Sequence, residues 1–333
     1  MKEDLYNKID EYFKTDMVLI KNLNYLYKVS LTYKIISTLG LIITFLGFLM
    51  IYVLKFDIKI KSIIFIIGIT IVIIGIFSLF FLILIYFLSD KAKRRENLII
   101  KRQFDNKKMF KIYNYFASVY LKDINISNFN FFYNNNKETR KGIENTITFI
   151  YKNNEITFYI EKPVKLPKVD FLMSIDIENT IVLFLLILFI KSRYNCVSTM
   201  YITTNKYDSS FNDIKVEKVK LNRRSFKSES IVFNKNYRIN VDANDIKGPL
   251  FLSPKLIDKI LSSNHKDFLE IGFNEKVYYK RMSVLKNNII EQIGILNYST
   301  INSYKKFKKQ LFIKIVSDFD SIKKSLDLII ATI

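Results

Sequence analysis

The sequence has almost none of the residue types on which most metal sites and many catalytic sites depend. It contains one cysteine, Cys196, and one histidine, His265. A single cysteine excludes a disulfide within the chain and is consistent with a reducing compartment. Zinc sites with paired histidine or cysteine ligands and most histidine-based triads are excluded as well. An enzyme that works with carboxylates and lysines stays possible.

Glycine, proline and tryptophan are also scarce, with 8 glycines, 4 prolines and no tryptophan. The sequence contains no glycine-rich phosphate loop, nucleophile elbow or kinase signature. We therefore assign no catalytic, cofactor-binding or metal-ligating residue from the sequence, and we expect no cofactor.

Lysine and arginine, in contrast, are abundant. The chain has 52 Lys and Arg against 31 Asp and Glu, which gives a formal net charge of +21. Such a charge can indicate a nucleic-acid or anionic-lipid partner. The abundance of lysine, asparagine and isoleucine is equally typical of a codon bias toward A and T. The charge alone is therefore no reason to predict a nucleic-acid partner, and we do not expect one.

Two long uncharged runs predict membrane-spanning helices. Residues 35–54 and residues 62–88 contain no charged side chain. As helices they would be about 30 Å and about 40 Å long, and the hydrocarbon core of a bilayer is about 30 Å thick. Because only the short loop 55–61 separates the runs, we expect a transmembrane hairpin over residues 35–88.

The basic residues around the two runs predict the orientation of the hairpin. Loop 55–61 carries Lys55, Lys59 and Lys61, whereas the segments before and after the hairpin carry many more lysines and arginines. Segments rich in lysine and arginine stay in the cytoplasm. We therefore expect a multi-pass plasma-membrane protein with both termini in the cytoplasm.

The hairpin and its flank suggest two further contacts. Basic residues after the second run are expected to attract anionic lipid headgroups, at about 1 kcal/mol per residue. Glycines two helical turns apart lie on one helix face, where another helix packs closely, either within the hairpin or in a homo-oligomer. The basic residues are Lys91, Lys93, Arg94 and Arg95, and the glycines are Gly40, Gly47, Gly68 and Gly75.

The remaining sequence predicts an α+β fold. Residues 1–34 are expected to contain a cytoplasmic amphipathic helix over residues 3–30, and residues 89–120 to form a basic juxtamembrane helix. Residues 121–333 are expected to form a cytoplasmic domain with a mainly antiparallel sheet and packed helices. The expected strands are 146–151, 156–161, 197–204, 230–233, 237–241, 268–273 and 276–280.

One helix start is well marked within this domain. Ser253 is a suitable N-cap, and Pro254 suits the first helical position. The following apolar residues are spaced as a buried stripe, namely Leu256, Ile257, Ile260 and Leu261. A last helix is expected over residues 301–330.

Three segments allow more than one interpretation. The apolar run 180–190 is too short to cross a bilayer as a straight helix, so a strand buried on both faces is favoured over a third span. The acidic segment 242–247 is interpreted as turn chemistry rather than a cation site. The alternating charges of residues 318–327 are interpreted as a solvent-exposed helix face.

The order of these segments resembles an uncharacterised bacterial two-span membrane family, domain of unknown function 3137. The resemblance depends on one stretch of the sequence. In it, Phe233 is followed by a short strand and an acidic turn, and Leu252-Ser253-Pro254 then begins a helix. The resemblance implies an N-terminal helix, a two-span hairpin and a cytoplasmic α+β domain. It implies no catalytic residue.

Two functions remain from the sequence. The first is a membrane-anchored module that binds a protein partner or associates with itself at the inner face of the membrane. The alternative is a membrane-bound enzyme that acts on lipid headgroups or nucleotides through Asp, Glu and Lys residues. A pocket with converging Asp, Glu, Lys or Tyr side chains would favour the enzyme, and a flat apolar or basic face would favour the module.

Overall fold

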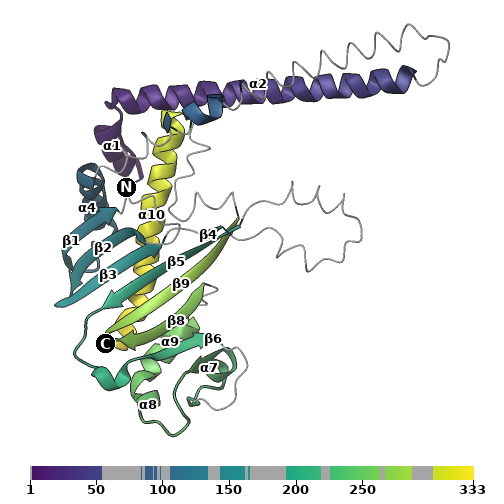
Figure 1. The fold of residues 1–333 in the computed structure, drawn as a ribbon. Helices are drawn as coiled ribbons and strands as arrows, with labels where there is room; N and C mark the ends of the chain where they lie inside the picture. Colours follow the sequence, from purple (N-terminus) through teal and green to yellow (C-terminus); the bar gives the residue numbers. More distant parts are fainter. Residues whose placement is uncertain are drawn as a thin grey trace. The chain divides into compact units, whose positions relative to one another are not determined.

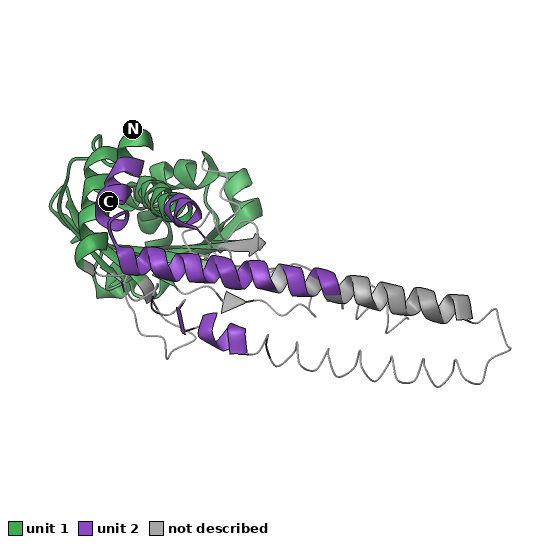
Figure 2. Cartoon of the chain, turned by 90° about the horizontal axis from the view of Figure 1, so that it is seen from above, with its two compact units in different colours: residues 1–5, 104–296, 310–333 green, residues 6–103, 297–309 purple. Residues whose placement is uncertain are grey.

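The structure is a computed structural model that divides the chain into two compact units (Figure 2). The first unit comprises residues 1–5, 104–296 and 310–333, and the second comprises residues 6–103 and 297–309. The residues described by the structure are 2–54, 84, 87–92, 94–95, 98, 106–133, 143–161, 164–165, 193–218, 226–262, 267–286 and 303–333.

The second unit begins with two helices where the sequence predicted one. Three residues separate the end of helix α1 (Lys2–Phe13) from the start of helix α2 (Met17–Leu54). Asp16 causes the break, because its side chain accepts a hydrogen bond from the backbone N–H of Leu19 at 3.1 Å and so caps α2. The prediction of one continuous helix over residues 3–30 was therefore wrong in this detail.

Helix α2 continues through residues 35–54, the first predicted span. Within the part of the chain that the structure describes, no helix is both long and apolar enough to cross a membrane. Loop 55–61 and nearly all of the second predicted span lie outside the described residues. The transmembrane hairpin therefore stays a prediction.

The second unit also contains the first turns of helix α10 (Tyr304–Ile329), which pack against α1. The rings of Phe13 and Phe307 lie edge to face, with centroids 5.4 Å apart. Asp10 accepts a hydrogen bond from the hydroxyl of Tyr304 at 2.8 Å and forms an ion pair with Lys308. This polar contact explains why Asp10, beside the buried residues Ile9 and Phe13, is partly buried.

The first unit contains one antiparallel sheet of nine strands, counted over the described residues (Figure 1). Its strands are ordered β1-β2-β3-β5-β9-β8-β6-β7, and β4 pairs separately with β5. The strands are β1 (Ile126–Tyr133), β2 (Ile143–Tyr151), β3 (Asn154–Glu161), β4 (Val164–Lys165), β5 (Arg193–Ile202), β6 (Ile214–Lys218), β7 (Tyr237–Ile239), β8 (Phe268–Asn274) and β9 (Lys276–Lys286). This result confirms the predicted α+β class and the predominance of antiparallel pairing.

The hairpin of β2 and β3 follows directly from the sequence. Tyr151 pairs with Asn154, so the connection is a two-residue turn formed by Lys152 and Asn153. Both turn residues have positive φ, 46° and 64°, as a type I′ turn requires. Because a two-residue turn fixes the register, the apolar residues of both strands fall on one face.

Helices cover one face of this sheet (Figure 1). The ring of Tyr113, on helix α4 (Asn106–Tyr120), stacks on Phe131 of β1 with centroids 3.9 Å apart. The ring of Phe319, on α10, stacks on that of Phe116 of α4, with centroids 6.3 Å apart. Alternate residues of the strands point toward the helices on this covered face, and most of them are large and fully buried. They are Ile147, Phe149, Ile156, Phe158, Met200, Ile202, Val216, Ile271, Val277 and Tyr279.

Short helices follow β6. Helices α7 (Ile231–Asn236), α8 (Lys247–Phe251) and α9 (Pro254–Ser262) join β6, β7 and β8. A 3-10 turn at Ser209–Phe211 precedes β6, and another at Ile330–Thr332 follows α10. The cap of α9 is confirmed, because the backbone N–H of Leu256 donates to Ser253 Oγ at 3.2 Å. Of the predicted stripe, Leu256, Ile257 and Ile260 are buried.

Residues 230–233 are not a strand, contrary to the prediction from their β-branched residues. Ser230 caps α7 by accepting a hydrogen bond from the N–H of Phe233 at 3.2 Å. Ile231 is 84% exposed, so it does not pack as a strand residue would. Here a local cap outweighs the strand propensity of two residues.

Candidate functional site

A row of three tyrosines crosses the face of the sheet opposite the helices. Residues on successive strands lie side by side when they are paired, and Tyr201 of β5 pairs with Tyr278 of β9. Their ring centroids are 6.2 Å apart, and the ring of Tyr201 lies edge to face with that of Tyr159 of β3 at 5.7 Å. This sheet face therefore presents aromatic rings on three neighbouring strands.

Gly272 of β8 makes room for one end of the row. A Cβ atom at this position would lie 2.8 Å from the hydroxyl oxygen of Tyr278 and even closer to the backbone oxygen of Ile214. Only glycine lets the Tyr278 ring lie this near to β8.

The pKa of the Tyr278 hydroxyl is raised above its ordinary value, mainly by burial and also by the nearby Glu270. The Tyr278 hydroxyl therefore loses its proton only at a higher pH than an ordinary tyrosine.

A cleft of about 420 Å³ lies along the other end of the tyrosine row. Threonines beside the tyrosines and the turn between β8 and β9 complete it. Glu275 in this turn adopts a positive φ of 58°, and its N–H donates to Asn212 Oδ1 at 2.9 Å, which fixes the turn. The lining residues are Thr157, Tyr159, Glu161, Thr199, Tyr201, Asn274, Glu275 and Lys276.

The two carboxylates of the cleft lie toward its opposite ends. Glu161 follows the residue paired with Ser198, whereas Glu275 lies two residues before the partner of Ile202. At about 3.3 Å per residue, these positions are roughly 20 Å apart along β5. Two acids that act on one bond are usually within about 10 Å of each other. The cleft thus has the residue types of an active site, but its acids do not converge.

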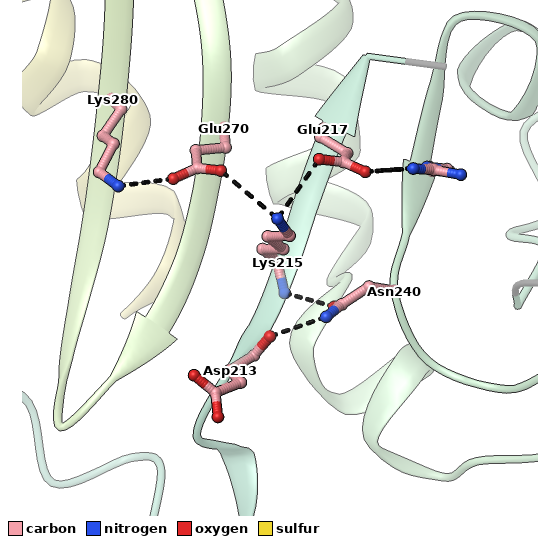
Figure 3. A network of polar contacts seen from close by, with 7 residues as sticks. Asp213, Lys215, Glu217, Asn240, Glu270 and Lys280 are labelled. Carbon is pink, nitrogen blue, oxygen red and sulfur yellow. Dashed lines mark hydrogen bonds and ion pairs between the residues drawn. The ribbon is translucent and has the colours of Figure 1, made fainter. Parts of the chain in front are cut away.

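Beyond Tyr278, charged side chains form a ladder across four strands (Figure 3). Lys280 donates to Glu270 at 2.7 Å, and Lys215 lies between Glu270 at 3.8 Å and Glu217 at 3.5 Å. Arg238 completes the ladder with two hydrogen bonds to Glu217, which are the main cause of the lowered pKa of that carboxyl group. The ladder neutralises most of its own charge.

Asn240 anchors the ladder at the end of β6. Its Oδ1 atom accepts a hydrogen bond from the N–H of Lys215 at 2.6 Å, and its Nδ2 atom donates to the carbonyl of Asp213 at 2.8 Å (Figure 3). Asp213 has a positive φ of 67°, a conformation that aspartate tolerates better than most residues. These bonds hold β6 and β7 in register at the edge of the sheet.

A second polar cluster lies inside the core. Asp318 of α10 accepts hydrogen bonds from the hydroxyl of Tyr113 at 2.5 Å and from Asn145 Nδ2 at 3.3 Å, and Lys314 lies at 3.5 Å. The side chains of Asp318 and Lys314 are both 1% exposed. Burial raises the pKa of Asp318, while Lys314 and Tyr113 oppose the shift.

This cluster corrects the interpretation of residues 318–327 as a solvent-exposed face. Asp320 and Asp327 are exposed, but Asp318 is not. Asp318 and Asp320 are two residues apart, so they lie on nearly opposite faces of α10, and one faces the core while the other is exposed. The acidic segment 242–247, in contrast, is a turn as predicted, because Asp245 Oδ1 accepts a hydrogen bond from the N–H of Lys247 at 2.9 Å.

The basic residues predicted to meet lipid headgroups differ in their surroundings. Lys91 and Arg94 are exposed, and Arg94 is paired with Asp90 at 3.1 Å. Arg95 instead donates to Asn22 Oδ1 at 2.8 Å and lies 5.1 Å from the ring centroid of Tyr25. Arg95 therefore holds α2 within the second unit. Lys93 lies outside the described residues.

The predicted glycine pairs are only partly described. Gly40 and Gly47 lie on α2, whereas Gly68 and Gly75 lie outside the described residues, as does the apolar run 180–190. Among the described residues, no three His, Cys, Asp or Glu side chains are grouped so that they could hold a metal ion.

The sequence matches no protein-family model, no curated protein and no solved structure. The resemblance to domain of unknown function 3137 therefore stays a prediction. The tyrosine row was not found from the sequence, although each of its strands was predicted. The missing signal is the pairing of β3, β5 and β9, which are far apart in the chain.

Proposed function

We propose that this chain is a membrane-anchored cytoplasmic module that binds a protein partner through the cleft beside the tyrosine row. The cleft carries the proposal, because it combines rigid aromatic rings with hydroxyl, amide and carboxylate groups in an open position on a sheet. Tyrosine is enriched in protein interfaces, since it offers a large contact area with little conformational freedom to lose.

The length of the cleft favours a polypeptide over a small molecule. A separation of roughly 20 Å between its two acids corresponds to about six residues of extended chain. The threonines and Asn274 offer hydrogen bonds along this length, and Tyr159 and Tyr201 offer ring faces and edges between which side chains can pack. The same length keeps Glu161 and Glu275 from acting together on one bond, so the module is favoured over the enzyme.

The membrane anchor belongs to the same proposal. The uncharged runs 35–54 and 62–88 support it, as does the helical conformation of the first run within α2. The basic flanks support cytoplasmic termini, and the exposure of Lys91 and Arg94 is compatible with contact to anionic headgroups. A cysteine introduced at Asp57 should react with an impermeant thiol reagent in intact cells, and one at Asn135 should not. The reverse pattern would disprove this orientation.

Site-specific photocrosslinking tests the cleft directly. A photoreactive phenylalanine derivative in place of Tyr201 should form a discrete protein adduct in native membranes. The same group in place of Lys255, which is exposed on α9 on the helix-covered side, is the matched control. The adduct at 201 should decrease at least tenfold when Tyr159→Ala is added, because the second ring of the cleft is then missing.

Two outcomes would contradict the proposed function. One is the absence of any adduct at position 201 under conditions in which the chain is intact and inserted. The other is the same set of adducts at positions 201 and 255, since this would show random collisions rather than a binding face.

A further inference from the structure

We infer that the Glu161 end of the cleft binds the positively charged end of a lysine or arginine side chain of the partner protein. This inference rests on the proposed function and specifies the chemistry of the ligand. It follows from a comparison of the two ends of the tyrosine row, one of which already holds a lysine of this chain.

At the occupied end, Lys280 lies over the face of Tyr278, with its Nζ atom 5.0 Å from the ring centroid. The same ammonium group donates to Glu270 Oε1 at 2.7 Å. An aromatic face attracts a cation through its quadrupole, and a carboxylate adds a charge-assisted hydrogen bond. This sheet face thus binds an ammonium group between a tyrosine ring and a glutamate.

At the cleft end, the same two groups recur. Tyr159 and Glu161 are two residues apart on β3, so both side chains stand on the same face, roughly 7 Å apart. On the other side of Tyr159 from Glu161, the ring of Tyr201 stands nearly perpendicular to that of Tyr159, at 76°. Glu161 is exposed, and within the described part of the chain no lysine or arginine forms an ion pair with it. A cation from outside would complete the arrangement.

A side chain of the partner fits the Glu161 end of the cleft better than a lipid headgroup. This end continues into the rest of the elongated cleft, where Thr157, Thr199 and Asn274 can bond the polypeptide that carries the cation. A choline headgroup has no such chain to place there. The net charge of +21 also repels basic peptides in general, so a preference for lysine would have to come from a local acidic site.

Two labelled peptides test the inference on the full chain in nanodiscs that lack choline lipids. The first is Thr-Ala-Lys-Ala-Thr-Ala with fluorescein at its N-terminus, and the second has norleucine in place of lysine. We expect the lysine peptide to bind about tenfold more tightly by fluorescence anisotropy, the size of one partly desolvated cation–π contact with a carboxylate. Glu161→Gln should remove this preference and leave binding of the norleucine peptide unchanged.

Matched variants separate the local chemistry from general effects. Asp258→Asn makes the same change of charge on α9, on the other side of the sheet, and should keep the tenfold preference. Tyr159→Phe, which keeps the ring, should keep it as well, whereas Tyr159→Leu should lose it. Circular dichroism of each variant confirms that the sheet is intact.

Three results would overturn the inference. They are equal binding of both peptides to the unaltered protein, a lysine preference that survives Glu161→Gln, and displacement of the lysine peptide by phosphocholine at lower concentration than by acetyl-lysine methylamide. If any of these occurs while adducts persist at position 201, the proposed function stands and only the lysine site is wrong. If the adducts are missing too, the proposed function fails with it.

Discussion

Neighbouring residues of β3 lie on opposite faces of the sheet, one covered by helices and the other lining the cleft. Ile156, Phe158 and Ile160 are buried under the helices, whereas Tyr159 and Glu161 line the cleft. Each face also has a polar cluster, the buried contacts of Asp318 on one side and the charged ladder on the other. The comparison teaches that the same kinds of ion pair have different roles depending on how much water reaches them.

The largest effect is expected from Asp318→Ala. This change leaves the ammonium group of Lys314 in the core without its carboxylate, and it removes the acceptor of the Tyr113 hydroxyl. Breaking a buried ion pair on one side typically costs about 3–5 kcal/mol. Urea denaturation of the full chain in detergent, followed by circular dichroism, should show this loss.

A double variant controls for this result. Lys314→Met combined with Asp318→Leu removes both charges, so it should be more stable than Asp318→Ala alone. A loss below about 1 kcal/mol for Asp318→Ala would show that water reaches the cluster, and the contrast between the two faces would disappear.

Adjacent residues on β3 offer the most direct comparison of the faces. Phe158→Ala opens a cavity in the core and should lower the free energy of unfolding by about 3–5 kcal/mol. Tyr159→Ala removes one ring contact at the cleft and should lower it by about 1 kcal/mol. The same denaturation measurement applies. Similar losses for both variants would mean that the cleft face is packed as tightly as the core.

The core-side tyrosine Tyr207 gives a smaller effect that depends on pH. Its hydroxyl donates to the carbonyl of Thr332 at 2.9 Å, and burial raises its pKa to about 12. Because this pKa is raised above the ordinary value of 10, the contribution of Tyr207 to stability is complete below pH 10 and is lost as the pH rises through about 12. Tyr207→Phe should therefore be less stable than the unaltered chain at pH 8 by about 1 kcal/mol.

The same variant should flatten the alkaline part of the stability profile. We expect the difference between Tyr207→Phe and the unaltered chain to shrink as urea midpoints are measured from pH 9 to pH 11.5. A constant difference over this range would show that Tyr207 titrates equally in the folded and unfolded states.

The smallest effect is expected in the charged ladder. Arg238 is bound to Glu217 by two hydrogen bonds, but both side chains remain about a quarter exposed, at 27% and 25%. Exposed pairs of this kind contribute about 0–1 kcal/mol. Arg238→Met should change the free energy of unfolding by less than about 1 kcal/mol, and 1 M NaCl should reduce the change further. A loss as large as that of Asp318→Ala would remove the distinction between the two clusters.

Local signals predicted the elements of the fold well. The pairing of the predicted strands 146–151 and 156–161 as a hairpin and the cap at Ser253 each depend on a few neighbouring residues, and the structure confirms both. Ser230 shows the limit of such reasoning, since a serine before two β-branched residues fits a strand or a helix cap equally. In the structure Phe233 is also buried in the core, which the sequence alone does not reveal.

The candidate site depends on information that no local pattern contains. Tyr159, Tyr201 and Tyr278 become neighbours only through the order in which β3, β5 and β9 pair. Asp318 was misplaced for the same reason, because Tyr113 of α4 and Asn145 of β2 contact the face of α10 that carries it, whereas the nearby Asp320 is exposed. Long-range pairing, rather than helix or strand propensity, separated the correct predictions from the rest.

The pairing of β5 with β9 also has a consequence for when the cleft can exist during the life of the chain. Strands β1, β2 and β3 follow one another closely, but β5 and β9 are separated by roughly 75 residues, and such distant pairings form late in folding. The ribosome must also have released β9 before the pairing can begin. A partner that binds the tyrosine row would therefore not bind shorter nascent chains. It would bind only chains whose synthesis has passed Lys286.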